Sequence, residues 1–335
     1  MIAVFRASHL RSNHLPVKAL IQPWAYIILV YVIVAHAVGS AHGKPPPSAA
    51  APVVLTKAGT EREAAQTWYA ALPSAPRPEL TKHGLVAGEI RRWQPRGANQ
   101  GVAVDDRHFY GIGNFIVGKY DKHTGERVQE WIGLRGGPIV HFNGGHVQDG
   151  LLVIAHSNFP QLPMASSLEY FDRQTVQPVK TLSLGIRLGS LTWAEKKDGF
   201  WWACFANYND KGTTPGFDQR WTYVGRFDEQ WNLLESWSFP PQVVATWGSS
   251  SCSGGSWGDD GFLYVTGHDA KELYVLQVPK MGVTLDYITT IDVPFEGQAW
   301  AWDRSEKRLI YGISRTSREV IVARIPELPA ELRQP

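Results

Sequence analysis

Short hydrophobic segments separated by turn residues run along most of this chain, and they predict β-strands rather than helices. The pattern is clearest in residues 99–131, where apolar or alternating segments at 101–104, 108–112, 115–120 and 127–131 are punctuated by Asp and Gly. Segments of this length and spacing are typical of β-hairpins. A lone four-stranded meander buries too little apolar surface to be stable. We therefore expect this segment to be one unit of a repeat.

The same pattern recurs along the rest of the chain. Further copies span 142–184, 189–239, 253–294 and 297–325. A four-stranded unit repeated every 40 to 50 residues or so is typical of β-propellers. The last copy stops after three strands, but Gly88–Trp93 (GEIRRW) resembles the fourth strand of the first copy. The sequence predicts an all-β, five-bladed propeller of four-stranded blades, closed by this N-terminal strand in the last blade.

The first 82 residues lie outside the repeat. A basic start, an apolar run at Trp24–Ala35 and small residues after it are typical of a secretion signal, and the run is shorter than the roughly 20 residues of a membrane anchor. We expect a secreted or extracytoplasmic protein; a retained anchor, with the propeller outside, is the alternative. The expected organisation is a signal or anchor at 1–43, a Pro/Ala-rich linker at 44–59, a short helix and Pro-rich connection at 60–82, the propeller at 83–328 and a tail at 329–335.

Composition narrows the expected partners. The chain has 335 residues, 19% of them charged, and a formal net charge of +2, which gives no reason to expect nucleic acid. It contains neither the HExxH zinc motif nor a P-loop. We expect a monomer that takes a small polar or carbohydrate ligand without a cofactor. Membrane contact is expected only if the N-terminal segment is retained.

The two faces of a propeller differ in what their loops carry. The turns between first and second strands, which define what we call the turn face, are Asp105-Asp106, Asp149-Gly150, Asp198-Gly199 and Asp260-Gly261. Asp and Gly are favoured in hairpin turns for backbone reasons, so we interpret these carboxylates as structural. The opposite face, the loop face, holds the starts of the inner strands and the ends of the second strands. We expect the site there.

Polar residues occupy equivalent loop-face positions in successive repeats. The expected substrate-binding residues are Gln100, Asn114, His141, Asn143, Asn158, Asn207, Gln298 and Arg315. The expected catalytic residues are Glu296, His156, His268 and Asp269. Glu296 is our choice for the general acid or base, because it is the only Glu on a crossing that directly enters an inner strand. The alternative is that this ring of polar groups bonds to itself and to ordered water.

Other features of the same face leave alternatives open. His141, His156, His268 and Asp269 are metal-ligand types, so a metal ion in the channel is one alternative. Long loops at 157–167 and 207–220 carry aromatic residues, on which sugars can stack. Cys204 and Cys252 lie in adjacent repeats and form either a disulfide or two free thiols.

One blade resembles a known family. Asn99-Gln100-Gly101, Tyr110, Lys119-Tyr120-Asp121 and Thr124-Gly125 are similar to the opening blade of plant-type glutaminyl cyclases, which are exported five-bladed propellers that cyclise N-terminal glutamine. The acidic strand motif expected in the middle of such a cyclase is missing from Trp201–Asn207, so this resemblance implies the fold and no catalytic residue. The predicted architecture also resembles that of arabinanase-like, carbohydrate-active propellers.

These observations favour an exported enzyme, a hydrolase or lyase, that acts on a carbohydrate or a related small polar substrate. A ring of polar groups beside aromatic loops is the feature that favours it. A non-catalytic binding or scaffold propeller is the first alternative, and a glutaminyl cyclase-like acyltransferase is the second.

Overall fold

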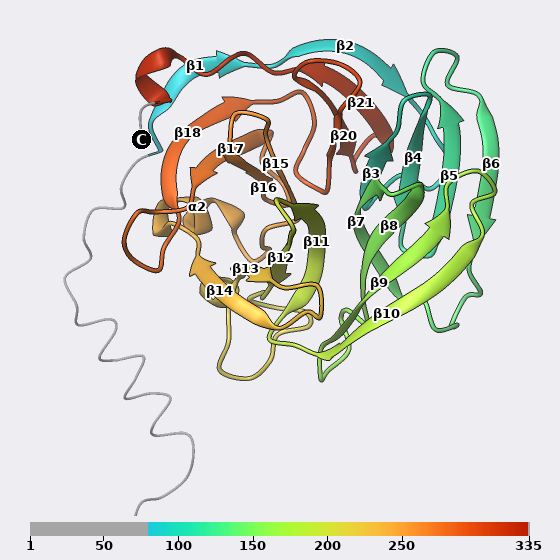
Figure 1. Ribbon diagram of the computed structural model, residues 1–335, viewed down its shortest axis with the longest axis horizontal. Coiled ribbons are helices and arrows are strands. Elements are labelled where there is room, and N and C mark those ends of the chain that lie inside the picture. The colour runs from blue at the N-terminus through green and yellow to red at the C-terminus, as the bar shows by residue number, and fades with distance from the viewer. Residues whose placement is uncertain (1–79, 334–335) are drawn as a thin grey trace, which may run out of the picture. The chain divides into compact units, whose positions relative to one another are not determined.

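A computed structural model describes residues 80–333 of the chain. The expected signal or anchor, the linker and the short helix lie outside this range. The described residues form five sheets arranged around a central axis, which is a five-bladed β-propeller (Figure 1). The predicted fold is therefore confirmed. Within the described part of the chain, no helix is long and apolar enough to cross a membrane.

Each blade begins with its inner strand at the axis and proceeds outward. Blade 1 contains β3 (Gly101–Val104), β4 (His108–Gly113), β5 (Ile116–Asp121) and β6 (Arg127–Ile132). Blade 2 contains β7 (His141–Gln148), β8 (Leu151–Ser157), β9 (Ala165–Asp172) and β10 (Pro178–Ile186). Blade 3 contains β11 (Ser190–Lys197), β12 (Phe200–Ala206), β13 (Tyr223–Phe227) and β14 (Leu233–Ser238).

The last two blades both include a strand from the N-terminal part of the described chain. Blade 4 contains β15 (Gly254–Trp257), β16 (Leu263–Thr266), β17 (Glu272–Gln277), β18 (Asp286–Asp292) and, outermost, β1 (Lys82–Val86). Blade 5 contains β19 (Ala301–Asp303), β20 (Leu309–Ser314), β21 (Glu319–Arg324) and β2 (Gly88–Trp93). Short helices lie in the connections and at the C-terminal end: η1 (Gln219–Trp221), α2 (Pro241–Val244), η2 (Ala245–Trp247) and η3 (Ala330–Leu332).

The N-terminal strand closes the ring as predicted. Strand β2 pairs antiparallel with β21, from Gly88 opposite Arg324 to Trp93 opposite Val320. Arg92 adds an ion pair to Glu319, with 3.0 Å between Nη1 and Oε2. The last blade is thus built from both ends of the described chain, and β21 has no open edge.

Strand β1 was not expected, because Lys82 was placed in a connection and each blade was given four strands. It pairs parallel with β18 as a fifth strand of blade 4. His83 supports the pairing through a contact of 2.9 Å between Nδ1 and Thr289 Oγ1. The segment KHGLV is mostly exposed, so its side chains lack the apolar alternation that identifies a strand in a sequence.

Aromatic side chains fill the spaces between blades. Between blades 3 and 4, Trp202 stacks on Trp237 with ring centroids 5.6 Å apart and meets the edge of Trp257 at 4.7 Å. Cys204 and Cys252 lie in the same buried cluster, and both are free thiols. Burial raises the pKa of the Cys204 thiol, with Cys252 beside it as a further cause. These two cysteines therefore belong to the core.

Inner strands β3, β7 and β15 and the segment that leads into β19 lie close together at four small residues, Gly101, Gly144, Gly254 and Ala299, which we call the waist. A Cβ atom on Gly101 would lie 2.6 Å from the backbone oxygen of Asn143 and 3.1 Å from Ala299 Cβ. A Cβ atom on Gly144 would lie 3.2 Å from the same Ala299 atom, and one on Gly254 would lie 2.7 Å from Ala299 Cα. The waist therefore closes the axial channel near its loop-face end.

Candidate functional site

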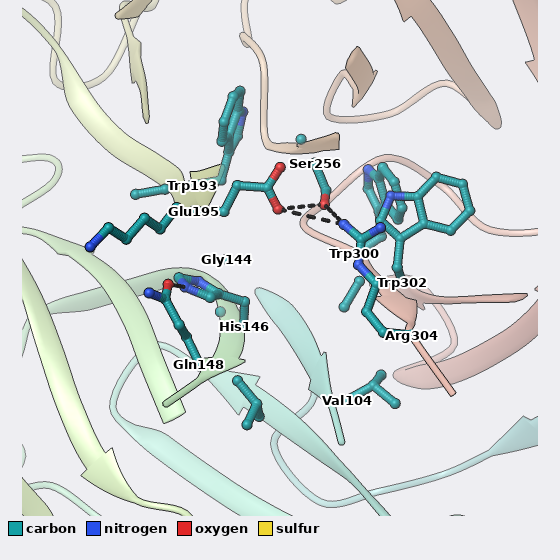
Figure 2. A pocket seen from close by; sticks show the side chains of 16 residues that line it. Val104, Gly144, His146, Gln148, Trp193, Glu195, Ser256, Trp300, Trp302 and Arg304 are labelled. Atoms are coloured by element: carbon teal, nitrogen blue, oxygen red, sulfur yellow. Dashed lines mark hydrogen bonds and ion pairs between the residues drawn. The ribbon is translucent and has the colours of Figure 1, made fainter. Parts of the chain in front are cut away.

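A cavity of about 160 Å³ lies on the axis between the waist and the turn face. All five inner strands or the turns that follow them contribute to its wall, with Val104, His146, Glu195, Ser256 and Trp302 as one example from each blade. Figure 2 shows these side chains around the opening. Most of them lie toward the C-terminal ends of the inner strands, so the cavity opens at the face opposite to the one that we expected to carry the site.

Glu195 provides the carboxyl group of this axial cavity. Its Oε2 accepts a hydrogen bond of 2.7 Å from Ser256 Oγ, and its Oε1 accepts one from the backbone N–H of Trp257. Arg304 Nη2 lies 3.9 Å from Oε2. Burial raises the pKa of Glu195 above its usual range, while the two hydrogen bonds act in the opposite direction. The carboxyl group is therefore held in place and takes up a proton at a higher pH than an exposed Glu.

His146 lies on β7, in the blade next to Glu195, and is held by Gln148. The Gln148 amide nitrogen donates to Asp149 Oδ2 at 3.1 Å, so its Oε1 faces His146 Nε2, also at 3.1 Å. The Nε2 hydrogen is donated to this oxygen, which leaves Nδ1 with a lone pair. Burial lowers the pKa of His146 to about 4. The ring is consequently neutral at neutral pH and can accept a hydrogen bond.

The charged groups of the cavity are balanced by nearby partners. Lys196 Nζ lies 2.6 Å from Glu229 Oε1, and Arg304 Nη1 lies 2.9 Å from Asp259 Oδ1. The remaining wall is formed largely by Trp193, Trp300, Trp302 and backbone. Aromatic walls with a few fixed polar groups and little net charge suit a neutral, hydroxyl-rich ligand better than an anion.

The structure brings three of the predicted loop-face residues together. His268 Nδ1 lies 2.6 Å from Asp269 Oδ1, and Arg315 Nη1 lies 2.8 Å from His268 Nε2. Since Arg315 can only donate, His268 accepts at Nε2 and carries its hydrogen at Nδ1. Gln100 and Asn114 form a second pair, with 2.6 Å between Nε2 and Oδ1. These groups bond mainly to one another.

His141 and His156 lie near this cluster. Burial, with smaller effects from the basic side chains of His156 and Arg315, lowers the pKa of His141 to about 4. His156 Nε2 accepts from the Val140 N–H at 3.0 Å, and its Nδ1 faces Ser167 Oγ at 2.8 Å. Both nitrogens of His156 are thus engaged, and burial lowers its pKa too.

The other predicted residues divide into two groups. Asn143 and Asn207 donate to the backbone oxygens of Leu191 and Trp221, and Asn158 bonds within its own loop. Glu296 and Gln298 are different, because Glu296 Oε2 and Gln298 Nε2 are buried and have no hydrogen-bond partner among the described residues. The structure does not test the catalytic role predicted for Glu296, and the Glu296→Gln variant described below does. Across residues 80–333, no group of three or more His, Cys, Asp or Glu side chains is placed to hold a metal ion.

Sequence reasoning missed Glu195, Ser256 and Arg304 because it treated the turn face as structural. A structural role for the turn carboxylates is supported at Asp105. Its Oδ1 accepts hydrogen bonds from the backbone N–H groups of Arg107 and His108 at 2.8 and 2.7 Å. One sequence pattern includes Ser256: residues 254–258 (GGSWG) match the G-x-S-x-G pattern of serine hydrolases. Ser256 lies within strand β15 rather than on a strand-to-helix turn and donates to Glu195, so the chemistry that this motif implies is not supported.

Comparisons with known proteins give only loose likenesses. No family model and no curated protein matches the chain. The PQQ-bound aldose sugar dehydrogenase of Streptomyces coelicolor is similar with a TM-score of 0.43 at 10% identity, over 69% of this chain and 79% of that one. A protein of unknown function from Bacteroides caccae gives 0.35 at 10% identity, over 67% and 73%. The coronin WD40 domain of Toxoplasma gondii gives 0.32 at 11%, over 74% and 62%. These likenesses carry no conclusion about ligand or activity.

Proposed function

We propose that this protein is an enzyme that acts on a small neutral saccharide or related polyol bound in the axial cavity. The observation that supports it best is the Glu195 carboxyl group, fixed at the cavity wall with a raised pKa and beside a neutral His146. In this proposal Glu195 transfers the proton, while His146 and Arg304 bind ligand hydroxyl groups. Export of the protein is a further part of the proposal, which rests on residues 1–43.

The reaction type follows from the number of carboxylates. Glycoside hydrolysis generally uses two of them, one on each side of the scissile bond. Glu195 is the only carboxylate among the described residues that line the cavity. A reaction that needs one proton-transfer group therefore fits this wall better than glycoside hydrolysis, and elimination by a lyase would also require a carbonyl group on the sugar next to the C–H bond that breaks.

A non-catalytic saccharide-binding propeller is the second candidate. Both Glu195 oxygens already accept hydrogen bonds from blade 4, and Arg304 of blade 5 lies beside them. A carboxylate that links three blades in this way can serve the architecture alone.

Two matched variants test the proposal. The purified protein is titrated calorimetrically with neutral mono- and disaccharides and with a peptide that begins with Gln, and products are followed by NMR. We expect saccharide turnover, a loss of about 100-fold or more in Glu195→Gln, and no change in Glu296→Gln. If Glu195 must be protonated to act, the rate falls as the pH rises through its raised pKa.

The outcomes separate the candidates. Saccharide binding without turnover favours the non-catalytic propeller. Loss of function in Glu296→Gln alone places the site at the loop face, as first expected. Turnover of the peptide alone supports the glutaminyl cyclase alternative, and no interaction with any of these compounds overturns the proposal.

A further inference from the structure

The axial cavity continues into a groove on the turn face between blades 3 and 4. Glu195, Lys196 and Arg304 line both the cavity and an adjoining depression of about 360 Å³. That depression shares Lys197, Asp198 and Trp257 with a groove of about 560 Å³. The three spaces therefore follow one another from the axis toward the rim of the propeller.

The groove has an aromatic floor and an exposed apolar rim. Its floor includes Trp202, Trp237 and Trp257, the packed rings that fill the space between these two blades. They are only 6 to 8% exposed, and cationic side chains lie over two of them. Its outer wall is the connection between β17 and β18, where the Met281 side chain is 91% exposed. Such a surface provides apolar contact to one side of a ligand and leaves the other side in water.

Most of the charges along the groove are paired with one another, and Lys280 adds one further cation to its lining. Lys197 Nζ lies 2.7 Å from Asp198 Oδ2, and Arg226 forms an ion pair with Glu235. Arg226 also lies over the Phe200 ring, 4.7 Å from its centroid. With two ion pairs and a single further cation, the groove lacks the dense positive charge that binds polyanions, so we expect a neutral ligand there.

We propose that the groove binds the chain of a neutral oligosaccharide whose terminal unit occupies the axial cavity. This inference rests on the proposed function for the identity of the ligand. The waist indicates that the cavity holds the end of the chain, because the waist closes the side of the cavity away from the groove. A chain that enters along the groove cannot pass through the axis, so the cavity accepts only a chain end.

The test is a chain-length series on the full protein. Malto-, xylo- and arabino-oligosaccharides of one to five units are titrated calorimetrically, together with neutral peptides of similar length. We expect the affinity for at least one series to rise about tenfold or more between one and three units and then level off. The Met281→Asp variant should bind the monosaccharide as the wild type does but lose most of this gain. Val283→Asp is the matched control, because Val283 is 74% exposed in the same connection but does not line the groove.

The inference and the proposed function can fail separately. Monosaccharide binding that depends on Glu195 but does not increase with length overturns the groove and leaves the proposed function intact. A length-dependent gain that persists in Met281→Asp, or is lost equally in Val283→Asp, also overturns it. Binding of peptides and of no saccharide overturns both.

Discussion

Two histidines near the axis make the stability of the propeller depend on pH. His141 and His146 each have a pKa of about 4 instead of 6.5, because burial disfavours the imidazolium. The folded-state pKa lies below the unfolded one, so this stability is fully present above pH 6.5. It is lost as the pH falls toward 4, because the unfolded chain takes up protons that the folded one does not.

The wild type should lose free energy of unfolding between pH 7.5 and pH 4. We expect this loss to be smaller by about 2 kcal/mol in His146→Asn, a figure that allows for the partial exposure of the side chain. The measurement is urea unfolding at pH 7.5, 5.5 and 4 for the wild type and the variant. His123→Asn, at an exposed turn position, is the control and should follow the wild-type curve. Equal pH dependence in His146→Asn and the wild type would show that His146 does not contribute.

The waist glycines are required for a different reason, which is space. A Cβ atom on Gly101 would meet the backbone oxygen of Asn143 at 2.6 Å, and a backbone atom cannot move aside as a side chain can. We expect Gly101→Ala to lower the free energy of unfolding by about 1–3 kcal/mol. Gly88→Ala is the matched control, because no atom lies within 4 Å of its added Cβ. Chemical denaturation of both variants checks this, and equal stability would mean that the inner strands can separate.

Most strands could be predicted from the sequence, because they bury alternating apolar residues and are separated from one another by turn residues. The closing strand β2 was predictable as well, through its likeness to another outer strand. Strand β1 was not, since its exposed side chains carry no pattern. The axial cavity was missed because local sequence does not show which end of the inner strands the waist closes. That depends on contacts between residues far apart, such as those of Ala299 with Gly101 and Gly144.

The two N-terminal strands contribute differently to the whole ring, and three truncations should show this. A chain that begins at residue 80 keeps both strands and should fold. One that begins at 87 loses β1 but keeps the ring closed, so it should melt cooperatively at a lower temperature. One that begins at 94 also loses β2, which exposes the edge of β21, and should not unfold cooperatively. Comparable melting temperatures for the first and third chains would contradict closure by β2.

Ring closure also determines when β1 and β2 can pair during synthesis of the chain. Strands β1 and β2 leave the ribosome before every other described strand, yet β1 pairs with β18 and β2 with β21. The hydrogen bond from Lys82 in β1 to Asp292 in β18 joins residues 210 positions apart, so it cannot form until β18 has been synthesised. Until then the nascent chain carries two unpartnered strands, and contacts of such long range form slowly. Incomplete chains that end before Glu319 should therefore remain open, prone to aggregation and dependent on chaperones, however well their middle blades have formed.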